Sequence, residues 1–423
     1  MKKILFFFII ALSFYCYAQP SRQGLNQMRG IFFDTIVIPS ADKADCYITY
    51  QTTYNRLVFV KDKDVFTSRF SLTIEAVDSL TGKVYREIVD NEHSVANFEE
   101  TNSESKYILG VIKLSLPMGS YKVLPVIYDF NTNSEHVLSQ FDLRLNFQDT
   151  KWVLSPIVLK DDSPKEIAGK VLAGFDGNVP FSDEEFNMII PVADTNVSVV
   201  YVELKNNDSL IYKDSLRNSV ISSLSFSRDK GEIIASFLSH QGSPTRNFIL
   251  PKFNQKLQEG TLQITVSRPG KEKAVFKRAV VWFNKPRSLN NLEYAVKILR
   301  NIEEGETESR KNDKTGEAMD YNGLWKYWKK FDPTPSTAYN ELMAEFYSRV
   351  DYAISNFSLI SNPNGADTDR GRVYIKFGKP KSVERIYQDA RDVREVWVYD
   401  SPERRFVFVD KTGLGNFILS GKL

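Results

Sequence analysis

The spacing of the apolar residues changes once along this chain, close to Pro286. Before that point apolar and polar residues alternate, as in residues 70–76. A period of two predicts strands with one buried face and one wet face. After it, the apolar residues of 289–302 recur every three or four positions, which predicts an amphipathic helix. The chain should therefore fold as β domains followed by a region that also contains helices.

The β part is long enough for two domains, and we expect them at residues 45–150 and 151–286. The run Leu116-Pro117-Met118-Gly119-Ser120-Tyr121 places a Pro-Gly turn before an aromatic strand. This pattern resembles the tyrosine corner of immunoglobulin-like sandwiches, where the phenol bonds back to the backbone. We predict two immunoglobulin-like β-sandwiches, although residues 206–240 show no clear period.

The remaining chain predicts a helix with a charged linker at 287–320 and a small α+β domain at 321–423. An aromatic helix should end at Asp332-Pro333-Thr334-Pro335, because proline disfavours helix in the residue before it. Thr337 is expected to cap a second helix that runs to about residue 357. Residues 372–377 alternate and predict a strand, followed by strands at 395–399 and 405–410. The expected arrangement is two helices packed on an antiparallel sheet.

The N-terminus indicates export. Lys2 and Lys3 precede a short apolar run, and small residues precede a cleavage point after Ala18, which predicts a secretory signal peptide at residues 1–18. A polar leader at 19–44 follows. The run is shorter than the ~20 residues of a spanning helix, so we expect no membrane span after cleavage. Tyr15 before Cys16 argues against a lipoprotein signal, and the expected location is periplasmic or at the cell surface.

Charge and composition exclude several classes of function. Loss of residues 1–18 removes two of the 55 basic residues and leaves 53 against 53 acidic ones. A balanced chain lacks the basic excess of a nucleic-acid binder. His93, His136 and His240 are scattered, and Cys46 is the cysteine outside the signal peptide, so we expect no metal, cofactor or internal disulfide.

Two sets of side chains in the last domain are candidate binding residues. In Thr368-Asp369-Arg370-Gly371-Arg372, Asp369 could act with Asp332 as a pair of acids for hydrolysis. Arg370 and Arg372 could then bind an anionic group with two hydrogen bonds each. Trp325 and Trp328 could stack on a sugar or line a peptide groove.

Structural roles explain the same residues, and we weigh them more heavily. Asp369 would accept backbone N–H bonds at a turn, Gly371 would supply an unusual backbone angle, and the arginines would pair with Asp332 or Glu395. Aromatic residues at helical spacing are more often core. The chain has no Gly-x-Ser-x-Gly, phosphate-loop or His-Glu-x-x-His pattern, so no catalytic residue is assigned.

The stretch from Asn362 to Pro380 resembles the GWxTD domain family of bacterial proteins. The naming motif stands here as Gly365-Ala366-Asp367-Thr368-Asp369, with Ala366 in place of the tryptophan. The tryptophan-containing helix before Asp332-Pro333-Thr334-Pro335 and the runs around Phe377-Gly378-Lys379-Pro380 and Arg405-Phe406-Val407 are also similar to the family. The resemblance covers the last quarter and implies an exported protein with β-rich regions ahead of this domain. It implies no reaction.

These observations predict an exported, non-catalytic protein of the cell envelope that binds a protein partner through its C-terminal domain. Two other functions stay open. The protein could be a hydrolase of an envelope peptide or glycan with Asp332 and Asp369 as acids. It could also be a carbohydrate-binding protein that uses its tryptophans.

Overall fold

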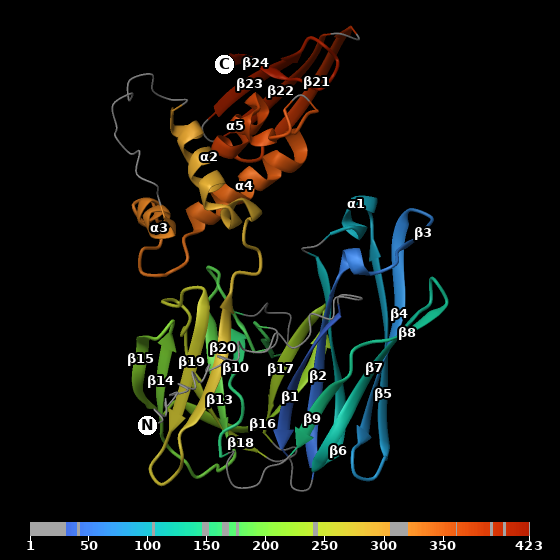
Figure 1. Ribbon diagram of the computed structural model, residues 1–423, viewed down its shortest axis with the longest axis vertical. Helices are drawn as coiled ribbons and strands as arrows, with labels where there is room; N and C mark the ends of the chain where they lie inside the picture. The colour runs from blue at the N-terminus through green and yellow to red at the C-terminus, as the bar shows by residue number, and fades with distance from the viewer. Residues whose placement is uncertain are drawn as a thin grey trace, which may run out of the picture. The chain divides into compact units, whose positions relative to one another are not determined.

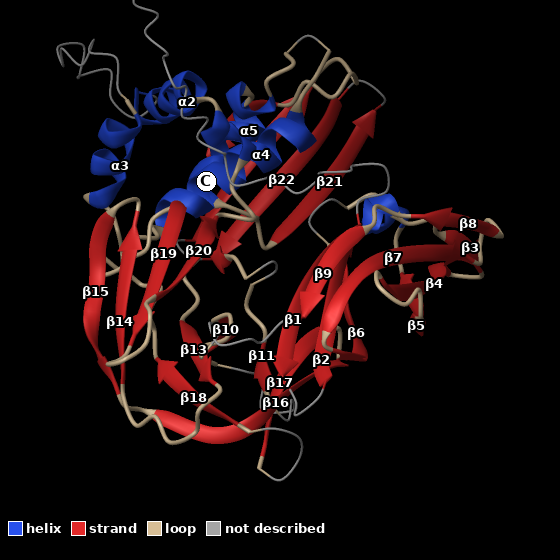
Figure 2. Ribbon diagram, turned by 60° about the horizontal axis from the view of Figure 1, so that its bottom comes forward, coloured by secondary structure: helices blue, strands red, loops and turns tan. Residues whose placement is uncertain are grey.

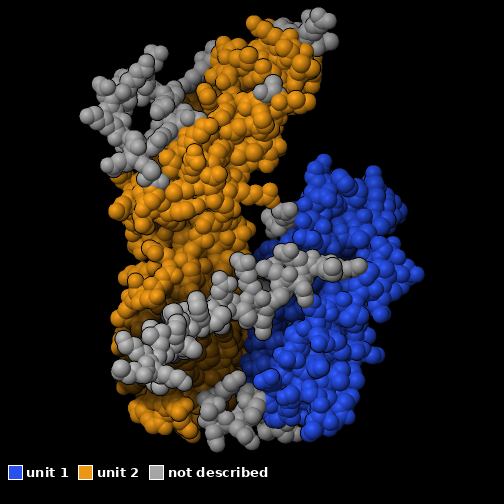
Figure 3. Space-filling view, in the orientation of Figure 1, with its two compact units in different colours: residues 1–147 blue, residues 148–423 orange. Residues whose placement is uncertain are grey.

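The computed structural model describes residues 31–39, 43–103, 106–145, 152–162, 169–174, 177–239, 244–304, 320–360, 362–389, 392–400 and 403–422. The predicted signal peptide lies outside these residues. The chain divides into two compact units, residues 1–147 and 148–423 (Figure 3). Within the described residues, no helix combines the length and the apolar character needed to cross a bilayer.

The first unit contains two antiparallel sheets (Figure 1). One sheet has the order β1 (Ile31–Pro39), β2 (Lys43–Thr53) and β6 (Tyr107–Pro117). The other is built on the long strands β4 (Val65–Asp78) and β7 (Gly119–Asp129), which pair with each other. Its other strands are β3 (Val60–Asp62), β5 (Val84–Val95), β8 (Ser134–Val137) and β9 (Phe141–Leu145), and two short helices, η1 (Tyr54–Arg56) and α1 (Phe98–Thr101), connect strands.

Both sheets of the first unit contribute to one core. Ile48 of β2 and Leu72 of β4 belong to the same cluster of buried side chains. The Tyr121 hydroxyl donates to the Pro117 carbonyl oxygen at 2.8 Å, which is the back-bond expected of the Pro-Gly turn. Gly110 of β6 lies against the Tyr50 ring. A larger residue would not fit there, because a Cβ would come within 2.1 Å of the ring.

Cys46 is buried in this core. Burial, and secondarily the charge of Asp45, raise the pKa of its thiol to about 12. A thiol with such a pKa stays protonated at neutral pH and is a poor nucleophile.

The second unit begins with two further sheets. The first has the order β10 (Ile157–Lys160), β13 (Phe186–Val192), β18 (Thr245–Leu250), β16 (Ser219–Asp229), β17 (Glu232–Leu238) and β11 (Lys170–Val171). The second has the order β12 (Val179–Pro180), β20 (Ala274–Val281), β19 (Gly260–Ser267), β14 (Val200–Asn206) and β15 (Ser209–Leu216). Strands β15 to β17 lie within residues 206–240, where the apolar residues show no clear period in the sequence.

Helices and a last sheet then follow, with α4 and α5 close to that sheet and α3 near β15 (Figure 2). The helices are η2 (Arg287–Asn290), α2 (Leu292–Glu304), α3 (Tyr321–Lys329), α4 (Glu341–Phe357), η3 (Gly365–Asp367) and α5 (Asp369–Phe377). The sheet is an antiparallel meander of β21 (Ser382–Asp389), β22 (Asp392–Asp400), β23 (Glu403–Asp410) and β24 (Ile418–Lys422). The protein is thus mostly β, with several antiparallel sheets and a C-terminal region of helices and sheet.

Two sequence-based expectations for this region are wrong. Residues 372–377 form helix α5 and not a strand, so the region has more helices than the two expected. The cap of α4 is Asn340, whose side chain accepts from Met343 N at 2.9 Å, and not Thr337. Asn340 also donates to Trp328 O at 2.9 Å, which joins the end of α3 to the start of α4.

The β sheets and the helices of the second unit share one continuous core. Phe181, Trp282, Trp325 and Tyr339 form an aromatic group whose paired ring centroids are 5.2–6.3 Å apart. Ala338 N also donates to Gln255 O at 2.7 Å. The C-terminal region is therefore packed on the preceding sheets of the second unit.

Candidate functional site

The Thr-Asp-Arg-Gly-Arg run begins helix α5. Thr368 is the N-cap, and its hydroxyl oxygen accepts from Gly371 N at 3.0 Å. A threonine cap satisfies one of the free N–H groups of the first helical turn. Val373 and Ile375 are both buried although residues two positions apart point to nearly opposite sides of a helix. Helix α5 therefore contacts protein on more than one side. Tyr374, between them, stacks on Tyr352 at 4.3 Å between centroids.

The glycines of this segment allow backbones to touch. A Cβ on Gly365 would lie 2.1 Å from Ala353 O of α4, and a Cβ on Gly371 would lie 2.0 Å from Gly365 O. Both obstacles are backbone atoms, which cannot move aside as a flexible side chain can. Gly371 is therefore required by close approach, and its φ is not among the positive ones, contrary to the expected unusual backbone angle. Ala366 has no exposed surface.

Asp369 and Arg370 connect α5 to the C-terminal sheet. The Asp369 carboxylate accepts from Leu419 N at 2.8 Å. Arg370 donates to Gly415 O at 3.3 Å and lies between two rings, with its guanidinium carbon 4.3 Å from the centroid of Phe417 and 5.1 Å from that of Phe357. Both residues hold elements of the fold together.

Glu395 is the buried partner of Arg370. Its side chain is 3% exposed and lies 3.6 Å from Arg370 and 3.1 Å from Arg385. Trp397 Nε1 donates to the same carboxylate at 2.6 Å. Burial lowers the pKa of the Arg370 guanidinium, and the charge of Glu395 opposes that shift. The ion pair between an arginine of the motif and Glu395 is present, as the structural interpretation expected.

Asp332 has its own set of partners in the turn between α3 and α4. Its side chain is 1% exposed. One carboxylate oxygen accepts from Thr334 N at 2.9 Å, and the other accepts from Lys329 Nζ at 3.0 Å. Asp332 thus belongs to this turn, whereas Asp369 belongs to the start of α5 and contacts β24.

The remaining candidates differ in exposure. Trp328 is 5% exposed and packs against the rings of Phe346 and Tyr347 at 5.0 and 5.9 Å. Trp325 is half-buried and faces the aromatic group described above. Arg372 is exposed on α5. Burial of Trp328 agrees with the interpretation that aromatic residues at this spacing form core.

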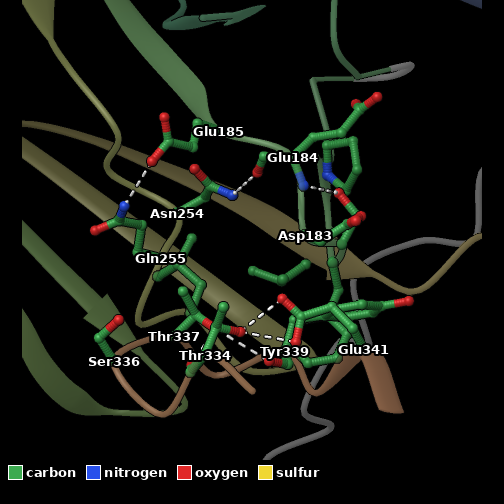
Figure 4. A pocket seen from close by; sticks show the side chains of 15 residues that line it. Asp183, Glu184, Glu185, Asn254, Gln255, Thr334, Ser336, Thr337, Tyr339 and Glu341 are labelled. Atoms are coloured by element: carbon green, nitrogen blue, oxygen red, sulfur yellow. Dashed lines mark hydrogen bonds between the residues drawn. The ribbon is translucent and has the colours of Figure 1, made fainter. Parts of the chain in front are cut away.

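A cavity that the sequence analysis missed lies beside the Asp332 turn (Figure 4). Its volume is about 270 Å³. Segments far apart in the sequence line it: residues 180–185, from the end of β12 onward; residues 254–257, which precede β19; Val280 of β20; and residues 334–341, which lead into α4. Two signals hint at it, the acidic run at 183–185 and the Thr334-Pro335 step, but neither indicates that the segments meet.

The walls of this cavity carry acidic groups. Asp183, Glu184, Glu185 and Glu341 line it, and the lining includes no lysine, arginine, histidine or cysteine. Figure 4 shows Thr334, Tyr339 and Glu341 on one side and Asn254, Gln255 and Glu185 on the other. Burial, followed by the charges of Asp183 and Glu341, raises the pKa of the Tyr339 hydroxyl to about 12.

Most of these acidic side chains already have a partner. Glu341 accepts from Thr334 Oγ1 at 2.6 and 2.7 Å. Glu184 pairs with Lys160 at 3.1 Å, and Glu185 pairs with Lys252 at 2.6 Å and accepts from Gln255 at 2.9 Å. Asp183 is exposed, and no hydrogen bond or ion pair among the described residues engages its carboxylate.

Residues 265–417 match the family model of the GWxTD domain. The C-terminal region is a GWxTD domain. The match confirms the resemblance seen in the sequence, and it begins inside β19, well before residue 321. The GWxTD domain therefore includes β20, which is part of a sheet of the preceding region. It also supplies residues 334–341 of the cavity wall.

Other comparisons add little. No curated protein matches this chain. A solved β-glucuronidase of glycoside hydrolase family 2 is similar at a TM-score of 0.14 and 10% identity, over 59% of this chain and 20% of that one. The chain spans about a fifth of that protein's length, and a likeness this weak carries no argument about fold or activity.

Proposed function

We propose that this protein is an exported, non-catalytic protein of the cell envelope that binds a protein partner through its GWxTD domain. One observation carries the proposal. The motif side chains Asp369 and Arg370 are engaged with Leu419, Gly415 and Glu395, so they stabilise the domain. The cavity beside the Asp332 turn, in contrast, leaves Asp183 open to an incoming group.

The same geometry gives less support to hydrolysis. A pair of catalytic carboxylates must converge on one substrate. Asp332 is almost fully covered and bonded to Thr334 and Lys329, and Asp369 is bonded to a strand of the C-terminal sheet. Stacking on sugars needs exposed aromatic faces, and Trp328 offers none.

Export and the finer fold of the β regions are part of this proposal. The signal peptide would be cleaved after Ala18 and leave the protein in the periplasm or at the cell surface. The β regions would be immunoglobulin-like sandwiches, a proposal supported by the shared core of the first two sheets and by the bond from Tyr121 to Pro117 O.

Site-specific photocrosslinking in the native cell tests the binding function. A photoreactive residue at Ser336, in the cavity lining, should give a discrete crosslinked product in the envelope fraction. The same residue at Leu80, which is 93% exposed in the turn between β4 and β5 of the other unit, is the matched control. Absence of any product from Ser336 and from other exposed positions of the GWxTD domain would contradict the proposal.

A further inference from the structure

The cavity has an apolar inner wall as well as acidic groups. Phe181, Leu257 and Val280 line it and are almost fully buried. Pro180 and the ring of Tyr339 complete this apolar part. An occupant would therefore need an apolar stem as well as a charged end, which is how long basic side chains distribute their burial.

The volume indicates the size of the occupant. Sites for small organic ligands usually enclose about 300–1,000 Å³. A cavity of about 270 Å³ lies below that range and is matched better to a single long side chain. Hydroxyl groups, among them those of Ser336 and Thr337, and the amide of Gln255 also line it and offer further hydrogen-bond acceptors.

The acidic groups of the lining are not arranged as the ligands of a metal ion. Metal ions need several ligands converging on one point at 2.0–2.6 Å, as a general rule. The residues that the structure describes contain no group of three or more His, Cys, Asp or Glu side chains able to hold a metal. Acidic groups spread over the walls instead suit a cation with several divergent donors.

We propose that the cavity binds the side chain of one lysine or arginine presented by the partner protein. This inference rests on the proposed function and names the group that the site recognises. The methylenes of the basic side chain lie along Phe181 and Tyr339, and the ammonium or guanidinium group bonds to Asp183 and the hydroxyl-lined rim. The carboxylate of Asp183, which no described residue engages, and the absence of any basic side chain from the lining favour this charge.

Small analogues of the side chain test the inference on the full chain. Nα-acetyl-lysine amide and Nα-acetyl-arginine amide should bind with a Kd on the order of 1 mM, measured by saturation-transfer NMR. Nα-acetyl-norleucine amide, which keeps the apolar stem and lacks the charge, should bind at least about tenfold more weakly. Asp183→Asn should weaken binding of the cations by about tenfold, and Asp400→Asn, which removes an exposed carboxylate of β22, should leave it unchanged.

Three results would overturn the inference. The first is binding of the norleucine compound as tight as that of the two cations. The second is saturable binding of Ca²⁺ or Mg²⁺, added as chloride salts, at the same site. The third is no saturation-transfer signal from either cationic compound at concentrations well above the expected Kd. Because Asp183 is exposed, its variant should fold normally, and the unfolding temperature checks this. If the crosslinked partner persists in cells while the cations fail to bind, the interaction function stands and only this recognition chemistry is wrong.

Discussion

The carboxylate of Asp369 accepts a hydrogen bond from the backbone N–H of Leu419, at 2.8 Å and across fifty residues of chain. It joins the first turn of α5 to β24, the strand at one edge of the C-terminal sheet. An acidic residue at this position also interacts favourably with the positive end of the helix dipole. The aspartate of the motif thus has two stabilising roles.

Replacing Asp369 should loosen β24. Asp369→Ala removes the acceptor for Leu419 N and should cost about 1 kcal/mol, because the bond is exposed to water. Hydrogen exchange should become faster at Leu419, while exchange in β22 stays slow. Arg372→Ala, one turn away and exposed, is the matched control and should leave exchange unchanged. Protection of Leu419 equal to that of the unchanged protein would contradict the assigned role.

Adding one methyl group to Gly371 should prevent normal folding. Gly371→Ala places a Cβ 2.0 Å from Gly365 O, and a backbone atom can yield only by separating η3 from α5. The expected loss of stability is about 3 kcal/mol or more, in the range of severe overpacking. Gly421→Ala makes the same chemical change where nothing lies within 4 Å, and its urea midpoint should stay near that of the parent.

Asp410 should make the C-terminal region sensitive to acid. Burial opposes ionisation of its carboxyl group, but hydrogen bonds from Thr412, Gly415 and Gly413 outweigh burial and lower the pKa. A folded-state pKa below the unfolded value adds stability above the unfolded pKa, and this stability is lost as the pH falls through the folded one. Stability should therefore drop as the pH falls below about 4, the ordinary pKa of an aspartate side chain.

The variant Asp410→Asn checks this pH dependence. It should lose about 2 kcal/mol at neutral pH, since an amide N–H₂ would face Gly415 N in place of an acceptor. Urea unfolding at several pH values should then show a flatter acid limb than that of the parent. An acid limb of unchanged slope would mean that other carboxyl groups control the transition.

The GWxTD domain should not fold from residue 321 onward. Its helices share a core with the preceding sheets, through Phe181 and Trp282, and the family match itself starts at residue 265. We expect residues 321–423 alone to lack near-UV circular dichroism and to bind hydrophobic dyes, whereas residues 148–423 unfold cooperatively. Cooperative unfolding of the short fragment would show that the aromatic contacts are dispensable.

Much of the β architecture follows from alternation in the sequence, because sheets with one buried face keep a period of two. The pattern failed at residues 206–240, where strand β16 buries polar side chains. Ser222 is buried there and accepts from the Asn247 amide at 3.0 Å, so hydrogen bonds replace apolar contacts. The alternation of apolar and polar residues therefore cannot predict a strand whose buried face carries polar side chains.

The candidate site was predictable only in part. The pairing of a motif arginine with Glu395 and the bond from Asp369 to a backbone N–H both follow from general preferences of these side chains. Helix α5 was not predicted because Val373, Ile375 and Phe377 alternate with polar residues, which is the pattern of a strand. In the structure residues 372–377 lie in one helix that contacts protein on more than one side. The cavity was missed because the segments of its wall are distant in the sequence and meet only through tertiary packing.

Cys46 gives the first unit a built-in reporter of its own opening. The thiol is buried and protonated, so reagents that modify thiolates should reach it only when β2 and β6 separate. The rate of its labelling under native conditions then measures how often this unit opens locally, and no introduced probe is needed. A change in this labelling rate when a partner is added would show that binding at the GWxTD domain alters the opening of the first unit.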